Sequence, residues 1–319
     1  MCASCRYDSG VHEDTLLQHI ATATRDLPRE FPRVVVGPGD DCAVVRVGVG
    51  ESGECVLLKT DQVVEGVHFP TGTDVSWIAR KAIARPMSDI AAMAGRPIST
   101  MATVTLSRST SQVEATRLAD AVHEWGRRFQ CPIVGGDIAT FGPVDGPMVI
   151  GVSVVGVPHP SRGPVLRSGA RRGDGVYVTG VVGGSFHAGT GGGRHLEFEP
   201  RVEVASALAD LLGGSLHAMM DTSDGLGIDA GRLARASGVA IEIDEQSIPL
   251  GEPEVLEAIA RGEDYELLFA ADSSVPVPSS LAGVPITRIG RVMEGQGCTL
   301  VRHDGTRRNI ASLGWEHHS

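Results

Sequence analysis

The sequence predicts a two-domain protein of mixed α and β structure. At 319 residues, the chain exceeds the comfortable size of a single hydrophobic core. Between residues 34 and 157, apolar runs typical of strands are separated by runs typical of helices. A second series follows residues 158–174, which are rich in Pro, Gly and Arg. We therefore predict domains at 1–157 and 158–319, with a mixed sheet in the first and an α/β arrangement in the second.

In the first half, the clearest helix is predicted over residues 111–130. Ser111 and Glu114 have the spacing of a capping box, and apolar residues recur at three- and four-residue spacings after them. Three apolar runs predict strands, at 55–60, 100–106 and 148–157.

Another helix-like run, from residue 76 to 94, contains Pro86. Because proline removes a donor inside a helix, we expect the run to break there and a second helix to begin near Ser88. Ser88 and Asp89 are then either the cap of that helix or part of a binding site.

In the second half, two helices are predicted with glycine at their ends, Gly213 and Gly238. The helices span 201–212 and 224–237, and strands are predicted at 175–180, 239–243 and 265–270.

Composition narrows the class of function. Hydrophobic residues make up 42% of the chain and charged residues 21%, as in folded globular proteins. The net charge of −11 argues against a nucleic-acid partner, because phosphate backbones are bound by clustered Lys and Arg. No apolar run approaches the roughly 20 residues that span a bilayer. We expect no membrane partner and a cytoplasmic location.

Acidic residues recur in junctions rich in Gly, Ser or Thr between the periodic segments. Taken singly, each is typical of a turn or a helix cap. Carboxylates that converge repel one another unless divalent cations neutralise them, and Mg²⁺ takes oxygen ligands from carboxylates and phosphates together. The sequence therefore predicts a site for several metal ions and a polyphosphate. Its candidate residues are Asp41, Asp61, Asp89, Asp137, Asp221 and Asp224.

One junction, Gly135-Gly136-Asp137, adds a reason to expect a phosphate. Paired glycines let the backbone approach a phosphate closely, and the adjoining acid could hold the accompanying metal. The familiar nucleotide-binding motifs are absent, both GxxxxGK[ST] and the kinase-type glycine-rich loop with its partner elements.

The motifs, in their order, resemble those of the thiamine-monophosphate kinase family, from about residue 34 to 317. That family belongs to the superfamily of aminoimidazole ribonucleotide synthetase. The strings that carry the resemblance are GPGDDCAVV, KTDQVVEGVHF, SDIAAMAGRP, GGD, LRSGARRGD, VTGVVGGS, DTSDGLGIDAGRLARASGVAIEID, GEDYELLF and GWEH.

The resemblance implies an aminoimidazole ribonucleotide synthetase-like fold, a homodimer formed largely by the N-terminal domains, and ATP with several Mg²⁺ ions at the site. It implies catalytic roles for Asp41, Asp137 and Asp224. The implied metal ligands are Asp41, Thr60, Asp61, Asp89, Asp137, Asp221 and Asp224. The implied ATP contacts are Gly136, Asp137, Arg167 and Ser223, and the implied substrate contacts are His68, Glu263 and Trp315.

Some positions depart from the family pattern. Lys59 stands where relatives often have a small residue, Pro86 replaces the usual Asn, and Arg261 precedes GED where Gly is usual. The segment 183–196 is shorter than in relatives. These departures leave two alternatives open, namely another ATP-using enzyme of the superfamily or an inactive nucleotide-binding homologue.

The mechanism that the resemblance implies is direct in-line phosphoryl transfer from ATP to thiamine monophosphate. The acceptor is already a phosphate monoester, so its oxygen is anionic and needs no strong general base. We expect Arg167 to neutralise phosphate charge and His68 to position the substrate. Trp315 either stacks on the substrate rings or pins the tail onto the second domain.

Overall fold

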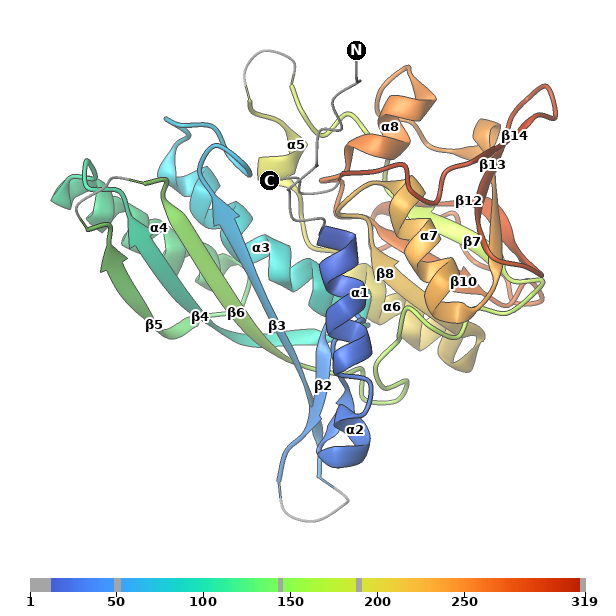
Figure 1. Ribbon diagram of the computed structural model, residues 1–319, viewed down its shortest axis with the longest axis horizontal. Helices are drawn as coiled ribbons and strands as arrows, with labels where there is room; N and C mark the ends of the chain where they lie inside the picture. Colours follow the sequence, from blue (N-terminus) through green and yellow to red (C-terminus); the bar gives the residue numbers. More distant parts are fainter. Residues whose placement is uncertain (1–12, 49–52, 143–145, 188–190, 316–319) are drawn as a thin grey trace, which may run out of the picture.

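The computed structural model describes residues 13–48, 53–142, 146–187 and 191–315. The described chain forms two units that lie side by side, each built on one β-sheet (Figure 1). Two helices, α1 (Glu13–Ala23) and α2 (Leu27–Glu30), precede the first sheet.

The first sheet has six strands in the order β1-β2-β3-β6-β4-β5. Strands β4 and β5 run parallel, and the other neighbouring pairs are antiparallel. The strands are β1 (Val34–Val36), β2 (Ala43–Arg46), β3 (Cys55–Val64), β4 (Arg96–Leu106), β5 (Ile133–Thr140) and β6 (Val149–Val157).

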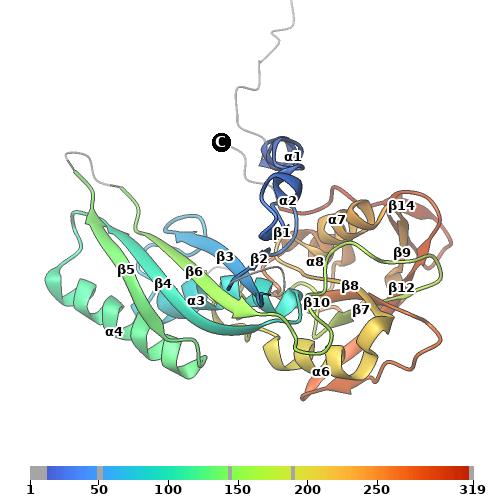
Figure 2. The same cartoon turned by 90° about the horizontal axis from the view of Figure 1, so that it is seen from below.

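Two helices, α3 (Val75–Ala92) and α4 (Gln112–Arg128), pack on one face of this sheet (Figure 2). Alternate residues of β6, including Ile150 and Val152, point into the core beneath them. On the opposite face, Leu58 is 39% exposed and Met101 is 50% exposed. The first sheet therefore has one packed face and one largely open face.

The second sheet has helices on both faces. Alternate residues of one central strand show this, because Leu268 packs in the same core as Leu226 of α7 while Phe269 packs with Leu208 of α6. The helices are α5 (Arg194–Glu197), α6 (Val202–Leu212), α7 (Leu226–Ser237) and α8 (Val255–Arg261), with short 3₁₀ turns η1 (Gly213–Ser215) and η2 (Glu245–Ser247).

The strand order of the second sheet is β14-β13-β9-β12-β7-β10-β8, with β11 paired to β12. Only β9 and β13 are parallel neighbours among the described pairs. The strands are β7 (Gly175–Thr179), β8 (Leu216–Asp221), β9 (Ala240–Asp244), β10 (Leu267–Ala271), β11 (Ser280–Leu281), β12 (Val284–Met293), β13 (Gly297–Val301) and β14 (Arg307–Asn309).

The expected break at Pro86 is wrong, because α3 continues through it as one helix. An interior proline costs a helix about 3 kcal/mol or more. Here α3 lies between the first sheet and the second domain and is buried on nearly all sides, including at Ile83 and Ile90. This packing offsets the proline. Ser88 is consequently not a cap but an interior helix residue.

The mixed α and β class and the two-domain fold are confirmed. The capping box of Ser111 and Glu114 is present, and Gly238 ends α7 in the left-handed conformation. The division at residue 158 stays a prediction, with the two sheets on either side of residues 158–174. Within the described residues, no helix is long and apolar enough to cross a membrane.

Candidate active site

Three buried aspartates from distant parts of the chain meet where the two domains adjoin. Asp41 follows β1, Asp89 lies in the last turn of α3, and Asp221 ends β8. Each is at most 6% exposed, and each offers a carboxylate oxygen that lies within 4.8 Å of the other two. Carboxylates this close in a buried setting repel one another unless cations lie among them. We call these three residues the carboxylate cluster.

Local structure brings each member to the cluster. Gly39 adopts a φ of +123°, which favours glycine, and turns the chain just before Asp41. Asp221 is held from the side by Ser88, whose Oγ donates a hydrogen bond to Asp221 Oδ2 at 2.7 Å. The continuous helix α3 thus contributes two adjacent residues, Ser88 and Asp89, to the site.

Two basic side chains border the carboxylate cluster. Arg167, from the segment between the domains, donates from Nε to Asp41 Oδ1 at 3.0 Å. Lys59 of β3 donates from Nζ to Asp89 Oδ1 at 2.6 Å and lies 3.6 Å from Asp61 Oδ1. Although burial opposes it, the negative charges nearby raise the pKa of each base above its ordinary value. Both side chains are therefore cationic at neutral pH.

The carboxylates of the site outnumber its two basic side chains, so the site keeps a net negative charge. Burial, followed by the charge of Asp41, raises the pKa of Asp221 to about 6 and that of Asp40 to about 6. Burial also raises the pKa of Asp89. Among the described residues, Asp41 Oδ2 is buried and has no hydrogen-bond partner. An unpartnered carboxylate oxygen in such a group suits a hard divalent cation, for which oxygen is the preferred ligand.

A pocket of about 500 Å³ adjoins the carboxylate cluster through the loop that follows Asp221. It brings together four residues that were predicted to contact substrate or ATP, from both halves of the chain. Its lining consists of Val67, His68, Arg85, Phe186, Ser223, Asp224, Leu256, Glu257, Ala260, Arg261, Glu263 and Trp315. Trp315 is 54% exposed, and its backbone N–H donates to the Asp224 carbonyl at 2.7 Å.

A fully buried lysine, which the sequence analysis missed, supports two lining residues of this pocket. Lys81 Nζ donates to the His68 carbonyl at 2.7 Å and forms an ion pair with Glu263. It also donates to His195 Nδ1 at 3.0 Å. Burial lowers the pKa of Lys81 to about 8, and burial together with the charge of Lys81 lowers the pKa of His195 to about 4. His195 is therefore a neutral acceptor.

Glu263 itself has an unusual backbone. Its φ is +58°, in the left-handed region that side chains rarely adopt, and Tyr265 has a φ of +52°. Such conformations persist only where the surroundings impose them, and they are concentrated at functional sites. The strain at Glu263 is therefore consistent with a binding role.

Asp224 lies outside the carboxylate cluster. Its carboxylate is paired with Arg232, which also donates to Asp229 Oδ1 at 2.9 Å. Burial raises the pKa of Asp229 to about 8, with the charge of Asp224 adding to the effect. Asp224 instead lines the pocket together with the predicted substrate residues His68, Glu263 and Trp315.

Two of the residues predicted as metal ligands, Thr60 and Asp137, lie on the open face of the first sheet, and their roles as ligands stay predictions. Neighbouring strand residues point to opposite faces, and Thr60 is on the open face of the first sheet while Asp61 is on the helix-covered face. Asp137 also belongs to the open face, on the edge strand β5. Three strand spacings separate it from β3, or roughly 14 Å.

Gly136 lies beside Asp137 in β5. A Cβ built at Gly136 would lie 1.8 Å from the Ala102 carbonyl oxygen, so only glycine fits against β4 there. This close packing is a structural reason for glycine at position 136. Its contact with ATP stays a prediction.

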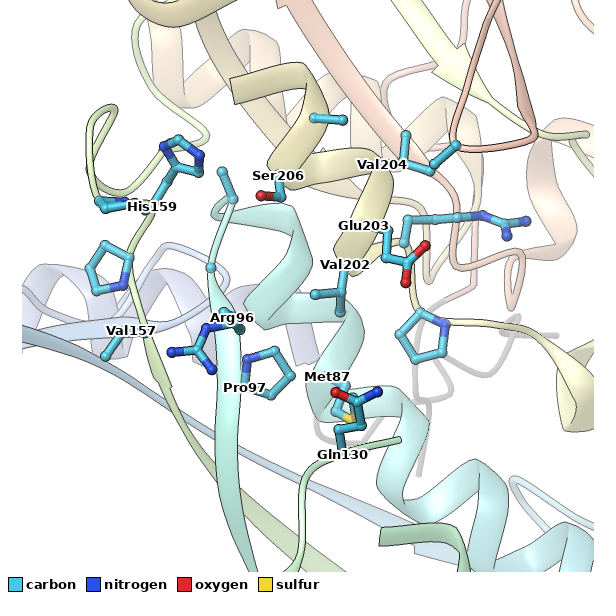
Figure 3. Close-up of a pocket in the computed structure, with 18 of the residues that line it drawn as sticks. Met87, Arg96, Pro97, Gln130, Val157, His159, Val202, Glu203, Val204 and Ser206 are labelled. Atoms are coloured by element: carbon cyan, nitrogen blue, oxygen red, sulfur yellow. The ribbon is translucent and has the colours of Figure 1, made fainter. Parts of the chain in front are cut away.

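A larger pocket, of about 1330 Å³, lies between α6 and the ends of β4 and β6 (Figure 3). It is bordered by Arg96, Gln130, His159 and Glu203, and by none of the predicted site residues. His159 pairs with Asp210 at 3.2 Å on its wall. Among the described residues, the acids of this pocket form no close group like Asp41, Asp89 and Asp221, so we take the smaller pocket and the carboxylate cluster as the candidate site.

Known proteins resemble the chain along most of its length. Residues 39–158 match the N-terminal domain of AIR synthase related proteins, and residues 171–303 match their C-terminal domain. The thiamine-monophosphate kinase of Rhodopirellula baltica is 35% identical over 291 residues, covering 86% of this chain and 88% of that protein. These matches confirm the family resemblance that the motifs predicted.

Two solved structures share the fold. AaThiL complexed with AMPPCP and TMP superposes with a TM-score of 0.77 at 29% identity, covering 96% of this chain and 97% of that one. The HypE-HypF complex superposes with a TM-score of 0.69 at 19% identity, covering 89% of this chain and 98% of the matched chain. The second likeness concerns the fold alone.

Proposed function

Since the chain belongs to the thiamine-monophosphate kinases, within the AIR synthase related proteins, we propose that it transfers the γ-phosphoryl group of ATP to thiamine monophosphate. The products are thiamine diphosphate and ADP. The observation that carries this proposal is the adjacency of the carboxylate cluster to the smaller pocket, because Asp221 belongs to the cluster while Ser223 and Asp224 line the pocket. A phosphate chain at the cluster would therefore lie beside an acceptor in the pocket.

The residues fit Mg²⁺ as the accompanying metal. The cluster offers only oxygen ligands, one of them the unpartnered Asp41 Oδ2, and it is too acidic to bind a phosphate chain without cations. Asp41, Asp89 and Asp221 would hold the ions, with Asp61 beside them. Mg²⁺ held there would supply positive charge that offsets the charge developing on the phosphates.

The chain's own residues then have mainly positioning roles. An oxygen of the acceptor's phosphate forms the new bond to the γ-phosphorus, and the bond to the β–γ bridging oxygen breaks, so ADP leaves with that electron pair. The acceptor oxygen is already anionic, so no side chain has to remove a proton. Arg167 adds positive charge near the phosphates, and His68 and Glu263 orient the acceptor.

The aromatic side of the pocket supports thiamine as the acceptor. Trp315 and Phe186 line it together with Leu256, and the acidic Glu257 and Glu263 give it negative charge. Thiamine combines flat rings with a positive charge, which an indole face and carboxylates attract. Incubation with ATP, Mg²⁺ and thiamine monophosphate, followed by separation of the thiamine phosphates, tests this function.

We further propose that the chain works as a homodimer through the open face of the first sheet. Leu58 and Met101 are exposed there, and β5 is an edge strand of the sheet as far as the structure describes it. Thr60 and Asp137 lie on the same face but too far apart to share a ligand within one chain. A second copy across this face would bring its own Asp137 toward Thr60, as a symmetric interface allows. Light scattering should then give about twice 33.4 kDa.

A further inference from the structure

Lys59 occupies an unusual position for a lysine. Its Nζ donates to Asp89 Oδ1 at 2.6 Å, and Asp61 Oδ1 lies 3.6 Å away on the same strand. Because side chains two apart on a strand share a face, Lys59 and Asp61 both point toward Asp89. The ammonium is therefore held between two carboxylates, one of which belongs to the carboxylate cluster.

The choice of lysine is itself informative. The chain contains only two lysines, Lys59 and Lys81, among 28 basic residues. Lys81 is fully buried and Lys59 is partly buried, with 22% of its side chain exposed, and both ammonium groups face carboxylates. Every other position that carries Lys or Arg is arginine. Lysine presents a compact point charge, whereas guanidinium is a broad planar fork. Of the two basic groups, the ammonium is the closer substitute for a small metal cation.

The position of Nζ has a consequence for metal binding. Because Asp89 Oδ1 accepts a hydrogen bond from Lys59, one of its lone pairs is no longer available to a metal ion. The ammonium also supplies the positive charge that a metal ion would otherwise supply at this position. On the other side of Asp89, the cluster with Asp41 and Asp221 still offers carboxylate oxygens to a cation, one of them the unpartnered Asp41 Oδ2. The Lys59 ammonium thus occupies one end of the site, and the carboxylate cluster at the other end is left for metal ions.

We propose that the Lys59 ammonium replaces one divalent ion, so that the site binds one ion fewer than it would with a small neutral side chain at position 59. This inference rests on the metal site of the proposed function. Since the ammonium is covalently attached, it does not dissociate when Mg²⁺ is scarce. The wild-type protein should therefore depend less steeply on Mg²⁺ concentration than a variant that needs an additional ion.

The test counts ions instead of measuring turnover. Mn²⁺ is titrated into the nucleotide-free protein and into its complex with AMPPCP, and bound ions are counted by calorimetry and by the electron paramagnetic resonance of free Mn²⁺. Lys59→Ser should bind one Mn²⁺ more per chain than wild type in at least one of these states. Lys59→Arg, which keeps the positive charge, should give the wild-type count.

A matched control and a stability readout complete the experiment. Lys81→Met removes the chain's other lysine and should leave the count unchanged, because Lys81 contacts Glu263 and not the cluster. Without metal, Lys59→Ser should have a lower melting temperature than wild type. Mn²⁺ should raise the melting temperature of Lys59→Ser by more than it raises that of wild type. A Lys59→Ser chain that folds only with Mn²⁺ present would support the proposal in the same way, and its ions can be counted in that state.

The outcomes separate the two proposals. Equal, non-zero counts in wild type and Lys59→Ser would overturn the role of Lys59 and leave the proposed function intact. Binding of no ions by either protein, with or without AMPPCP, would overturn the metal site and the inference with it.

Discussion

Ser88 Oγ donates a hydrogen bond to Asp221 Oδ2 at 2.7 Å, although the residues lie 133 positions apart in the chain. Ser88 belongs to α3 of the first domain and Asp221 ends β8 of the second. The bond thus joins the two domains at the carboxylate cluster and restrains the Asp221 carboxylate. The site depends on how the domains are held together as well as on its ligands.

Ser88→Ala should weaken metal binding more than it weakens the fold. Loss of one buried hydrogen bond costs about 1 kcal/mol, and Asp221 would be free to turn. We expect the Mg²⁺ concentration for half-maximal activity to rise severalfold. Ser111→Ala is a suitable control, because it removes the cap of α4 at a similar cost in stability but far from the site. An unchanged Mg²⁺ requirement in Ser88→Ala would show that the bond is only structural.

Asp41→Asn and Asp137→Asn should each abolish turnover while preserving the fold, and a mixture of the two should recover activity. If one active site combines Asp41 of one chain with Asp137 of its partner, a hybrid dimer has one intact site. Random mixing then restores roughly a quarter of wild-type activity, given a two-fold symmetric dimer. Co-refolded or co-expressed variants allow the measurement. Two inactive variants that stay inactive together, despite demonstrated hybrid formation, would contradict a shared site.

Trp315→Ala should raise the KM for thiamine monophosphate by roughly tenfold, a loss of about 1 to 2 kcal/mol of stacking, with little change in ATP affinity. The anchor between Trp315 and Asp224 uses the backbone N–H, so the substitution removes the ring and keeps that bond. Trp77→Ala, an exposed tryptophan outside the pocket, is the matched control. A fall in melting temperature without a change in KM would make Trp315 a structural anchor.

Lys81 should make the stability of the protein depend on pH in the alkaline range. Its pKa is lowered by burial to about 8, below the ordinary 10.5, so the unfolded chain binds the proton more tightly than the native one. Stability should therefore rise with pH between about 8 and 10.5, by on the order of 1 to 3 kcal/mol from this group. Urea unfolding of wild type and Lys81→Met across this range measures the difference. A difference that stays constant with pH would refute the assignment.

Local signals in the sequence predicted the fold well. The capping box at Ser111 and the terminal Gly238 act within a few residues, so their effect can be read directly from the chain. Pro86 gave a wrong prediction because the effect of a proline is also local, whereas its compensation comes from burial of α3 between the domains. Burial of that kind depends on tertiary packing.

The candidate site was predictable in part. The acids of the carboxylate cluster were found from their junctions, but their pairing was not, since Arg167 meets Asp41 across 126 positions and Lys59 meets Asp89 across 30. Strand alternation could have separated Thr60 from Asp61 in advance, because adjacent strand residues must face opposite ways. To predict the position of Asp137, one would need the strand order of the sheet, and no local sequence pattern specifies that order.

The central claim is phosphoryl transfer from ATP to thiamine monophosphate, and product analysis tests it most directly. The purified protein is incubated with ATP, Mg²⁺ and thiamine monophosphate, and nucleotides and thiamine phosphates are quantified together over time. We predict that thiamine diphosphate and ADP appear in equal amounts, that AMPPCP gives neither, and that Asp41→Asn is inactive. Formation of AMP, release of inorganic phosphate without thiamine diphosphate, or no reaction at saturating Mg²⁺ would contradict the account.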